Sequence, residues 1–362
     1  MPDFDFAARI AQAQALMAEE KFEVMLLSVG ADLPYFTGYQ AMPLERLTML
    51  VVTLDSEPAL VVPQLEAPRV EAGPFDLRPW TEAEDPVAIV ADLCRGAGAI
   101  ALSDQTWSVF LLGLQTQLPG STFRSATAIT RTLRSKKDPL EVEFLRRAAA
   151  GVDRVVARLA GSRFSGRTEI EMARLVTQMT LEEDHDQALF WIVASGPNSA
   201  SPHHEPGDRV IQSGDVVVVD FGGKHRGYSS DCTRTFVVGA ADAEQSEVHR
   251  VVHEAHRAAT AAVAVGVRAD EVDRAARRAI VEAGYGEHFI HRTGHGIGLE
   301  GHEHPYIVEG NSEKLEAGMC FSIEPGIYLP GRFGVRIEDI VTVTDEGVVS
   351  LNQGERALVS VG

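Results

Sequence analysis

Apolar residues recur at helical or strand spacing throughout the N-terminal third of the chain. Residues 5–20 place Phe6, Ile10, Ala13 and Met17 on one face, which predicts an amphipathic helix. The same rules predict further helices at 86–96 and 106–117, and strands at 24–29, 47–54, 59–62 and 100–102. Alternating helices and strands of this kind predict a layered α/β domain.

A polar run, Arg134-Ser135-Lys136-Lys137-Asp138-Pro139, interrupts this pattern and is our predicted domain boundary. Pro139 suits the first turn of a helix with Asp138 as its N-cap, so we expect a helix from 139 to about 159. The later pattern predicts helices at 168–183, 243–264 and 269–284, strands at 188–194 and 209–221, and mostly strand and glycine-rich loop over 288–360. Because the helices come in pairs between strand runs, we interpret 139–220 and 243–340 as two related halves.

The stretch from Val216 to Val237 predicts a β-hairpin that carries two aspartates. Four valines lead into Asp220, and Asp231 opens a second β-rich run. A turn centred on His225 and Arg226 would make the two aspartates direct cross-strand neighbours, with Cβ atoms about 5 Å apart. Two carboxylates at such a short distance repel each other, and a divalent cation between them would relieve the repulsion.

A second hairpin repeats this arrangement with two glutamates. Glu324 ends a β-like run at Pro325-Gly326, and Glu338 lies in the run that begins at Gly334. A turn centred near Gly331 would set Glu338 opposite Glu324. The sequence therefore predicts two cross-strand pairs of acids, each near a turn.

Histidines are confined to the second part of the chain, at and after His185. His295 lies between two glycines, which allow close backbone approach and leave the imidazole bare. His291 and His302 lie on either side of His295, too far along the loop to be taken as ligands, so we expect them to hold substrate or stabilise an oxyanion. His203, which follows Pro202 in another loop, is a further candidate for the substrate side.

Converging carboxylates favour a site with two metal ions. Four buried carboxylates would carry a charge of about −4, and desolvating unpaired charges costs several kcal/mol per ion. Two divalent cations would cancel that charge. Oxygen-rich ligation with one imidazole favours manganese, with cobalt or zinc as alternatives.

The composition and charge limit the classes of partner that the protein is expected to bind. The 362 residues leave room for two domains, and the net charge of −19 argues against nucleic acid or an anionic membrane as a partner. Three widely spaced cysteines offer no disulfide framework. We also expect no secretory signal and no membrane span, because the N-terminus lacks an apolar core and no apolar run reaches eighteen residues, so we expect a cytoplasmic protein.

Four motifs together resemble the pita-bread metallopeptidases, which include Xaa-Pro dipeptidases (prolidases), aminopeptidase P and methionine aminopeptidase. The motifs are VDFGGKHRGYSSDCTRTF, HRTGHGIGLEGHEHPY, FSIEPGIY and GVRIEDIV. ASGPNSASPHHEP favours the prolidase and aminopeptidase P branch, and Tyr35-Phe36-Thr37-Gly38 resembles the creatinase/prolidase N-terminal domain. The resemblance implies an α+β chain, with a smaller α/β domain at 1–133 and a catalytic pita-bread domain at 134–362.

The resemblance also implies a role for each site residue. Asp220 would bind one metal, Asp231 and Glu338 would bridge both, and His295 and Glu324 would bind the other. The remaining implied roles are substrate contact for His203, His291 and His302, orientation of the acids for Arg336, and proton transfer for Glu324.

The implied reaction is hydrolysis of the peptide bond before proline by a metal-bridging hydroxide, with Xaa-Pro dipeptides as the expected substrates. One alternative is an aminopeptidase P that acts on longer peptides; another is an inactive pita-bread binding protein. Tyr306 stands where some prolidases carry arginine, so the group that binds the proline carboxylate stays open. The family further suggests a homodimer.

Overall fold

The chain divides between Arg134 and Ser135 into two units. The computed structural model describes residues 4–362, so the first three residues of the predicted N-terminal domain lie outside the described part. Among the described residues, no helix is both long and apolar enough to cross a membrane.

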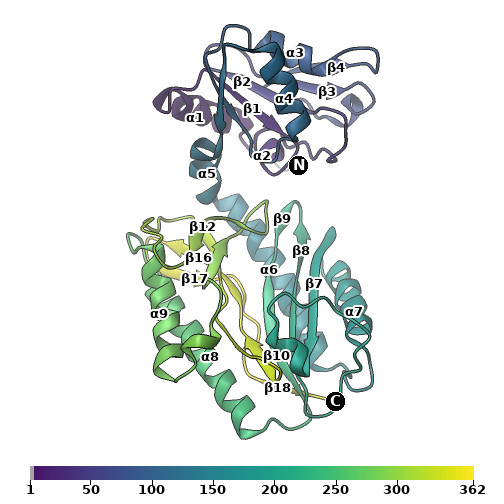
Figure 1. Ribbon diagram of the computed structural model, residues 1–362, viewed down its shortest axis with the longest axis vertical. Helices are drawn as coiled ribbons and strands as arrows, with labels where there is room; N and C mark the ends of the chain where they lie inside the picture. Colours follow the sequence, from purple (N-terminus) through teal and green to yellow (C-terminus); the bar gives the residue numbers. More distant parts are fainter. Residues whose placement is uncertain (1–3) are drawn as a thin grey trace. The chain divides into compact units, whose positions relative to one another are not determined.

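The first unit is built on a six-stranded sheet with the order β4-β3-β2-β1-β5-β6. Its strands are β1 (Val24–Ser28), β2 (Met49–Thr53), β3 (Ala59–Pro63), β4 (Asp76–Trp80), β5 (Ala99–Leu102) and β6 (Thr122–Ser125). Its helices are α1 (Phe6–Glu19), α2 (Asp32–Thr37), α3 (Pro86–Leu93), α4 (Ser108–Gln117) and α5 (Thr127–Ser135), with the 3-10 turn η1 (Ala67–Arg69). Helices α3 and α4 lie against the sheet and share its apolar core (Figure 1).

The predicted α/β layering of this unit is confirmed, but the pattern missed four elements: α2, α5 and the strands β4 and β6. The two strands form the outer edges of the sheet and expose much of their length. Edge strands need no continuous apolar run, because only part of their surface faces the core. Strand prediction from apolar runs therefore failed at both edges.

The second unit contains two pairs of helices and two main sheets. The helices are α6 (Pro139–Ala160), α7 (Glu169–Glu182), α8 (Ala243–Ala262) and α9 (Ala269–Glu282), with 3-10 turns η2 (Gly196–Ala200) and η3 (Gly286–His288). The first sheet has the order β18-β10-β8-β7, with β9 paired to β8: β7 (Gln187–Ser195), β8 (Val216–His225), β9 (Tyr228–Ser229), β10 (Cys232–Val238) and β18 (Val359–Val361). The second has the order β12-β11-β13-β16-β17: β11 (Gly294–Gly296), β12 (Glu303–Ile307), β13 (Cys320–Ile323), β16 (Asp339–Thr344) and β17 (Gly347–Ser350). A separate hairpin joins β14 (Gly326–Leu329) to β15 (Phe333–Arg336).

The two halves of this unit repeat one local design. In each half the first helix is followed by a turn whose glycine has φ +83°, Gly166 in one and Gly266 in the other. In each half the residue before the second helix forms an isolated bridge to a later segment, Thr168 with Val210 and Arg268 with Lys314. Each helix pair packs against its own strands in a separate core, and Figure 1 shows α7 and the α8–α9 pair on opposite sides of the strands.

The register predicted for the first hairpin is wrong by two residues. Lys224 pairs with Ser229 and His225 with Tyr228, so the turn centres on Arg226 and Gly227, both with positive φ. A two-residue turn of this handedness favours glycine, which Gly227 supplies. Asp220 consequently faces Thr233 rather than Asp231, but a shift by two keeps both aspartates on one face.

The register predicted for the second hairpin is confirmed. Ile323 pairs with Asp339 and Gly326 with Arg336, so the ladder on both sides of the gap sets Glu324 opposite Glu338. The strand predicted at 209–221 is partly wrong, because strand structure begins only at Val216. Before it, the Asp215 side chain accepts from the Gln212 N–H and from Arg209, which holds this stretch as a turn.

Candidate metal centre

Asp220 and Asp231 come from the first half of the second unit. Asp220 lies within β8, and Asp231 lies between β9 and β10. Arg336 donates to Asp220 Oδ2 over 2.7 Å, while Asp220 Oδ1 is buried and has no hydrogen-bond partner. A buried carboxylate oxygen without a donor is costly, so this atom is suited to a cation.

His295, Glu324 and Glu338 come from the second half. Ser322 holds two of them: its Oγ accepts from the His295 N–H over 3.0 Å and donates to Glu324 Oε1 over 3.0 Å. His295 Nε2 then lies 3.2 Å from Glu324 Oε1 and 3.6 Å from Asp231 Oδ2. A Cβ on Gly294 would lie 1.8 Å from the Ser322 carbonyl oxygen, so only glycine allows this close approach.

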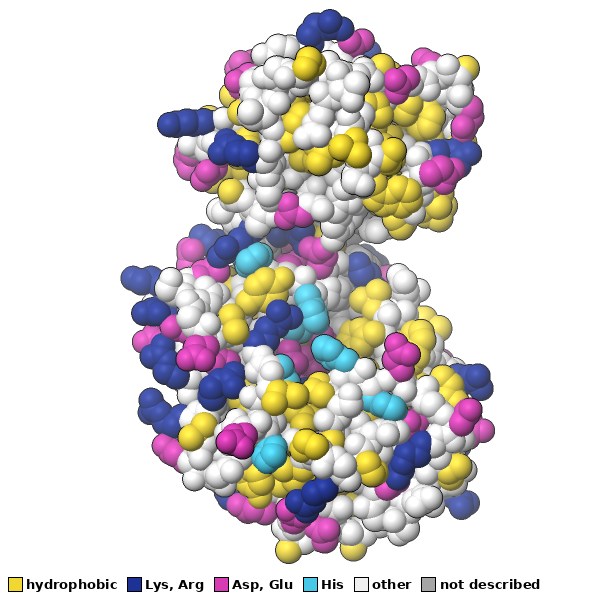
Figure 2. All heavy atoms as spheres, in the orientation of Figure 1, with side chains coloured by type: hydrophobic (Ala, Val, Ile, Leu, Met, Phe, Trp, Pro, Cys, Tyr) yellow, Lys and Arg dark blue, Asp and Glu magenta, His cyan; other side chains and the backbone are white. Residues whose placement is uncertain are grey.

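All five predicted ligands meet at one place. Three overlapping groups have ligand atoms within 4.8 Å of one another: Asp220, Asp231 and Glu338; His295, Glu324 and Glu338; and Asp231, His295 and His302. They line a cavity of ≈ 590 Å³ whose wall also includes Phe190, Ile192, Pro202 and Arg292. Figure 2 shows histidines around this hollow and acidic side chains in its depth.

The buried acids of this site need additional positive charge nearby, as the direction of their pKa shifts indicates. Burial raises the pKa of Asp231 and of Glu338 far above their ordinary values, and repulsion from the neighbouring carboxylates adds to the effect. Burial also raises the pKa of Asp220, against the opposing charge of Arg336. Burial would raise the pKa of Glu324 too, but the hydrogen bond and charge of His295 outweigh it and lower the pKa to about 2. Three acids disfavour ionisation unless a cation is added, so the donor set fits divalent metal ions.

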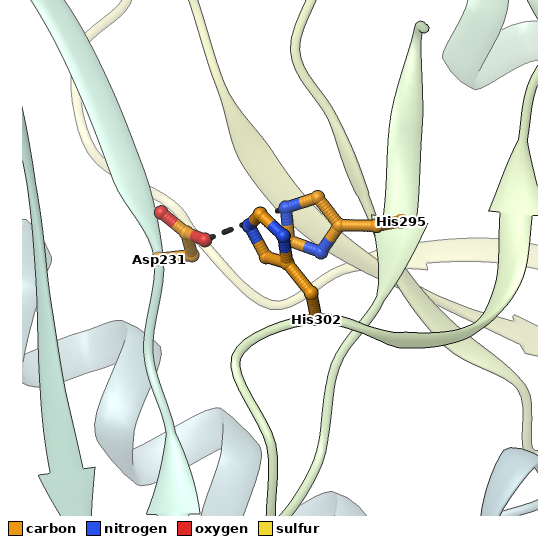
Figure 3. A group of neighbouring side chains, drawn as sticks. All are labelled: Asp231, His295 and His302. Carbon is orange, nitrogen blue, oxygen red and sulfur yellow. Dashed lines mark ion pairs between the residues drawn. The ribbon is translucent and has the colours of Figure 1, made fainter. Parts of the chain in front are cut away.

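His302 lies closer to the acids than we expected from its distance along the loop. Its ring centre is 3.8 Å from that of His295, and Figure 3 shows the two rings side by side at Asp231. Burial lowers its pKa to about 4, and the charges of His295 and Arg292 add to this. Because Arg292 Nη2 lies 3.2 Å from His302 Nδ1 and can only donate, the neutral ring carries its proton on Nε2.

His291 and His203 also line the cavity, but they differ in how firmly they are held. His291 Nδ1 donates to the Arg292 carbonyl over 2.7 Å, and Nε2 lies 2.9 Å from Tyr328 Oη, so both its nitrogens are engaged within the protein. His203 is exposed at the rim. Its neighbour His204 instead pairs with Glu169 over 2.8 Å.

Tyr328 is the main site residue that the sequence did not suggest. Its hydroxyl accepts from Arg336 Nη1 over 2.7 Å, which links His291 to the arginine that holds Asp220. A signal was present: Tyr328 follows Glu324 by four residues on the same side of the strand. It also faces Gly334, which has no side chain to displace it. Arg292 was also overlooked, although it directly follows His291.

Family comparisons agree with this architecture. Residues 143–345 match the model of metallopeptidase family M24, and residues 9–136 match the creatinase/prolidase N-terminal domain. The chain belongs to metallopeptidase family M24.

Similar proteins extend over nearly the whole chain. A protein named probable dipeptidase PepE from Mycobacterium tuberculosis is 43% identical over 98% of this chain and 96% of its own length. The Xaa-Pro dipeptidase of Lactobacillus helveticus is 35% identical over 95% of this chain and 96% of its own. The crystal structure of recombinant prolidase from Thermococcus sibiricus superposes with a TM-score of 0.95 at 37% identity, covering 99% and 100% of the two chains.

Proposed function

We propose that this metallopeptidase hydrolyses Xaa-Pro dipeptides with two divalent metal ions. The main support for this proposal is that four acids and His295 converge in a cavity of ≈ 590 Å³, a size that suits a small peptide. The similarity to proteins named Xaa-Pro dipeptidase and prolidase supports the substrate class.

The five predicted ligands would hold the metals: Asp220 one ion, His295 and Glu324 the other, with Asp231 and Glu338 shared between them. Bound divalent ions would lower the pKa of a water and polarise the carbonyl before proline. We propose manganese on the oxygen-rich donor set, with cobalt and zinc as the ions to compare.

The chain itself would supply the proton handling. Glu324 lines the cavity 3.2 Å from His295 Nε2, where its carboxylate can take the proton of the attacking water and pass it to the proline nitrogen. His302 directs its Nε2–H toward the acids, where it can donate to the oxyanion. His291 and His203 would border the proline, His291 as a fixed ring and His203 from the rim.

Arg292 is our candidate for the substrate carboxylate. Of the two arginines that line the cavity, Arg336 is paired with Asp220, whereas no carboxylate of the described chain lies within ion-pair distance of Arg292. Its guanidinium carbon lies 4.6 Å from the centre of the Tyr306 ring, which orients it. A cation held this way favours a dipeptide, whose free carboxylate lies next to the scissile bond.

The substrate test compares Leu-Pro with Arg-Pro-Pro in the presence of manganese. We expect efficient hydrolysis of the dipeptide and slow cleavage of the tripeptide. Efficient tripeptide cleavage without dipeptide turnover would instead establish the aminopeptidase P alternative. If neither peptide is hydrolysed and the protein binds no metal, the alternative of an inactive pita-bread binding protein is supported.

A second arm tests Arg292 with Ala-Pro and its C-terminal amide. Arg292→Ala should raise KM for the acid by roughly 10-fold or more, because a charge-assisted contact is lost, and should change KM for the amide little. Arg292→Lys should recover part of the difference. An equal loss on acid and amide would contradict this role.

We further propose a cytoplasmic homodimer. The three buried free cysteines suit a reducing compartment, and the family resemblance suggests the dimer.

A further inference from the structure

Glu338 occupies a gap in the strand ladder, between β15 and β16. Ladder hydrogen bonds therefore fix its neighbours on both sides but not its own main chain. Its N–H donates instead to the Thr233 carbonyl of β10 over 3.1 Å, and its Oε2 accepts from the Thr233 hydroxyl over 2.7 Å. The position of this carboxylate thus depends on contacts from a distant strand.

Arg234 supplies the strongest of these contacts. Its Nη1 donates to the carbonyl oxygens of Glu338 over 2.6 Å and of Thr233 over 2.9 Å. One planar guanidinium therefore joins the two main-chain segments that meet behind the acids. Its Nε donates to the Glu355 carbonyl over 2.7 Å, which ties the arginine to the C-terminal segment.

Asp339 holds Arg234 in this orientation. Asp339 Oδ1 accepts from Arg234 Nη2 over 2.7 Å, and the carboxylate is fully buried. Its Oδ2 pairs with Arg356 Nε and lies 3.1 Å from His256 Nε2. Arg356 is held in turn by the Asn352 carbonyl over 3.0 Å. A buried carboxylate among three cationic or polar partners is a rigid anchor, since breaking one contact leaves unpaired charge.

We propose that Arg234 and Asp339 are positioning residues that hold Glu338 in its metal-binding place. Neither side chain lines the cavity, and they act through the main chain of Glu338. This inference rests on the proposed function, because it takes Glu338 as a metal ligand.

The test is a titration of the full chain with manganese, in which the electron paramagnetic resonance signal of free Mn²⁺ measures how much metal is bound. Asp339→Asn keeps the shape of the side chain but removes the charge that orients Arg234. We expect it to weaken manganese binding by about 10–100-fold, the usual range for groups that orient metal ligands. Arg234→Lys should give an intermediate loss, because the ammonium keeps the charge without the planar fork. Excess manganese should restore much of the turnover at nearly unchanged KM.

The matched control is Asp32→Asn in the first unit, which removes the same charge from a pair with Arg134 at 2.7 Å. It should lower the melting temperature and leave manganese affinity within about twofold, because all the proposed metal ligands belong to the other unit. If Asp339→Asn fails to fold, Arg356→Gln removes an outer contact and should weaken manganese binding severalfold.

Two results would separate the possible failures. If the Asp339→Asn variant has a lower melting temperature but binds manganese like the wild type, the network serves stability alone and the proposal is overturned. Glu338→Ala that also binds manganese like the wild type would overturn the metal assignment itself.

Discussion

In the first half of the second unit, Asp220 lies within the continuous strand β8, and Asp231 lies in the short gap between β9 and β10, across which the pairing register is unchanged. In the second half, His295, Glu324 and Glu338 lie where the pairing is interrupted. The register shifts between His295 and Gly296, and β13 and β15 end just before Glu324 and Ile337–Glu338. Both halves share the paired helices and the glycine turn between them.

The difference shows two ways to aim a ligand. A continuous strand fixes the direction of its side chains through its own ladder, as β8 does for Asp220. An interrupted strand frees a side chain from the alternation, but its backbone must then be held by something else. Ser322 does this for His295, the Thr293 carbonyl does it for Glu324, and Thr233 and Arg234 do it for Glu338.

The largest expected effect comes from removing a ligand of the first hairpin. Asp231→Ala should lower kcat/KM by roughly 1,000-fold or more, because the reaction then loses the charge that holds the metals and activates water. Steady-state assays with Leu-Pro over a range of manganese concentrations measure it. The control is Asp186→Ala, which should retain activity: Asp186 lies just before β7, and its side chain accepts from the Arg226 N–H at the turn of that hairpin. Near-normal turnover of Asp231→Ala would refute its role.

A smaller loss is expected at the contact that joins the two halves. Tyr328→Phe removes the hydroxyl between His291 and Arg336, and Arg336 in turn holds Asp220. We expect about a 10–100-fold fall in kcat/KM. Tyr39→Phe, which removes a hydroxyl bonded to Glu66 in the first unit, should leave activity unchanged. Equal activities for the two variants would show that Tyr328 does not act on the site.

One of the buried positions at which the two helix pairs differ predicts a pH effect. His249 of α8 lies as far from its N-cap, Asp242, as Leu145 of α6 lies from Asp138. Burial, aided by the charge of His253, lowers the pKa of His249 from 6.5 to about 4. The unfolded chain therefore binds the proton more tightly, so the free energy of unfolding should fall as pH drops from 6.5 towards 4, by about 1–3 kcal/mol.

His249→Leu copies the residue of the other half and should remove this part of the pH dependence. Urea denaturation at several pH values measures it. His253→Leu, on the same helix but half-buried, serves as the control and should change the slope less. A wild-type slope in His249→Leu would assign the acid sensitivity to other groups.

The smallest effect is expected at the hairpin turns, each of which contains a glycine with positive φ. Gly227 (φ +86°) and Gly331 (φ +74°) take up left-handed backbone; an added Cβ would make only an ordinary contact with Leu299 at Gly227 and would meet nothing at Gly331. Alanine at each should cost about 1–2 kcal/mol from backbone strain alone. Thermal unfolding with Gly207→Ala as control, where φ is ordinary, measures it. If the two variants lose different amounts of unfolding free energy, one turn contributes to stability through more than its backbone strain.

The same contrast explains what the sequence could predict. Alternation along strands placed Asp220 with Asp231 and Glu324 with Glu338 on shared faces, and a register error of two residues did not separate the aspartates. The turn at Gly331 was found because one glycine marks it. The turn at Gly227 was missed because neighbouring residues also suit a turn.

Contacts between distant segments could not be predicted. Arg234 lies more than a hundred residues from Glu338, and no local pattern marks its guanidinium as the group that holds that carbonyl. The fold of the loop between His295 and His302 likewise decides that the two rings meet. Local periodicity therefore identified the ligands, whereas their supports required the packed structure.

The most direct test of this account counts the divalent ions that bind each folded chain. Metal-free protein is titrated with manganese by isothermal calorimetry, and bound metal is measured after gel filtration. We predict two ions per chain for the wild type and fewer than two, bound more weakly, for Glu338→Ala. A wild type that binds no ion, or a Glu338→Ala variant that binds two with unchanged affinity, would contradict it.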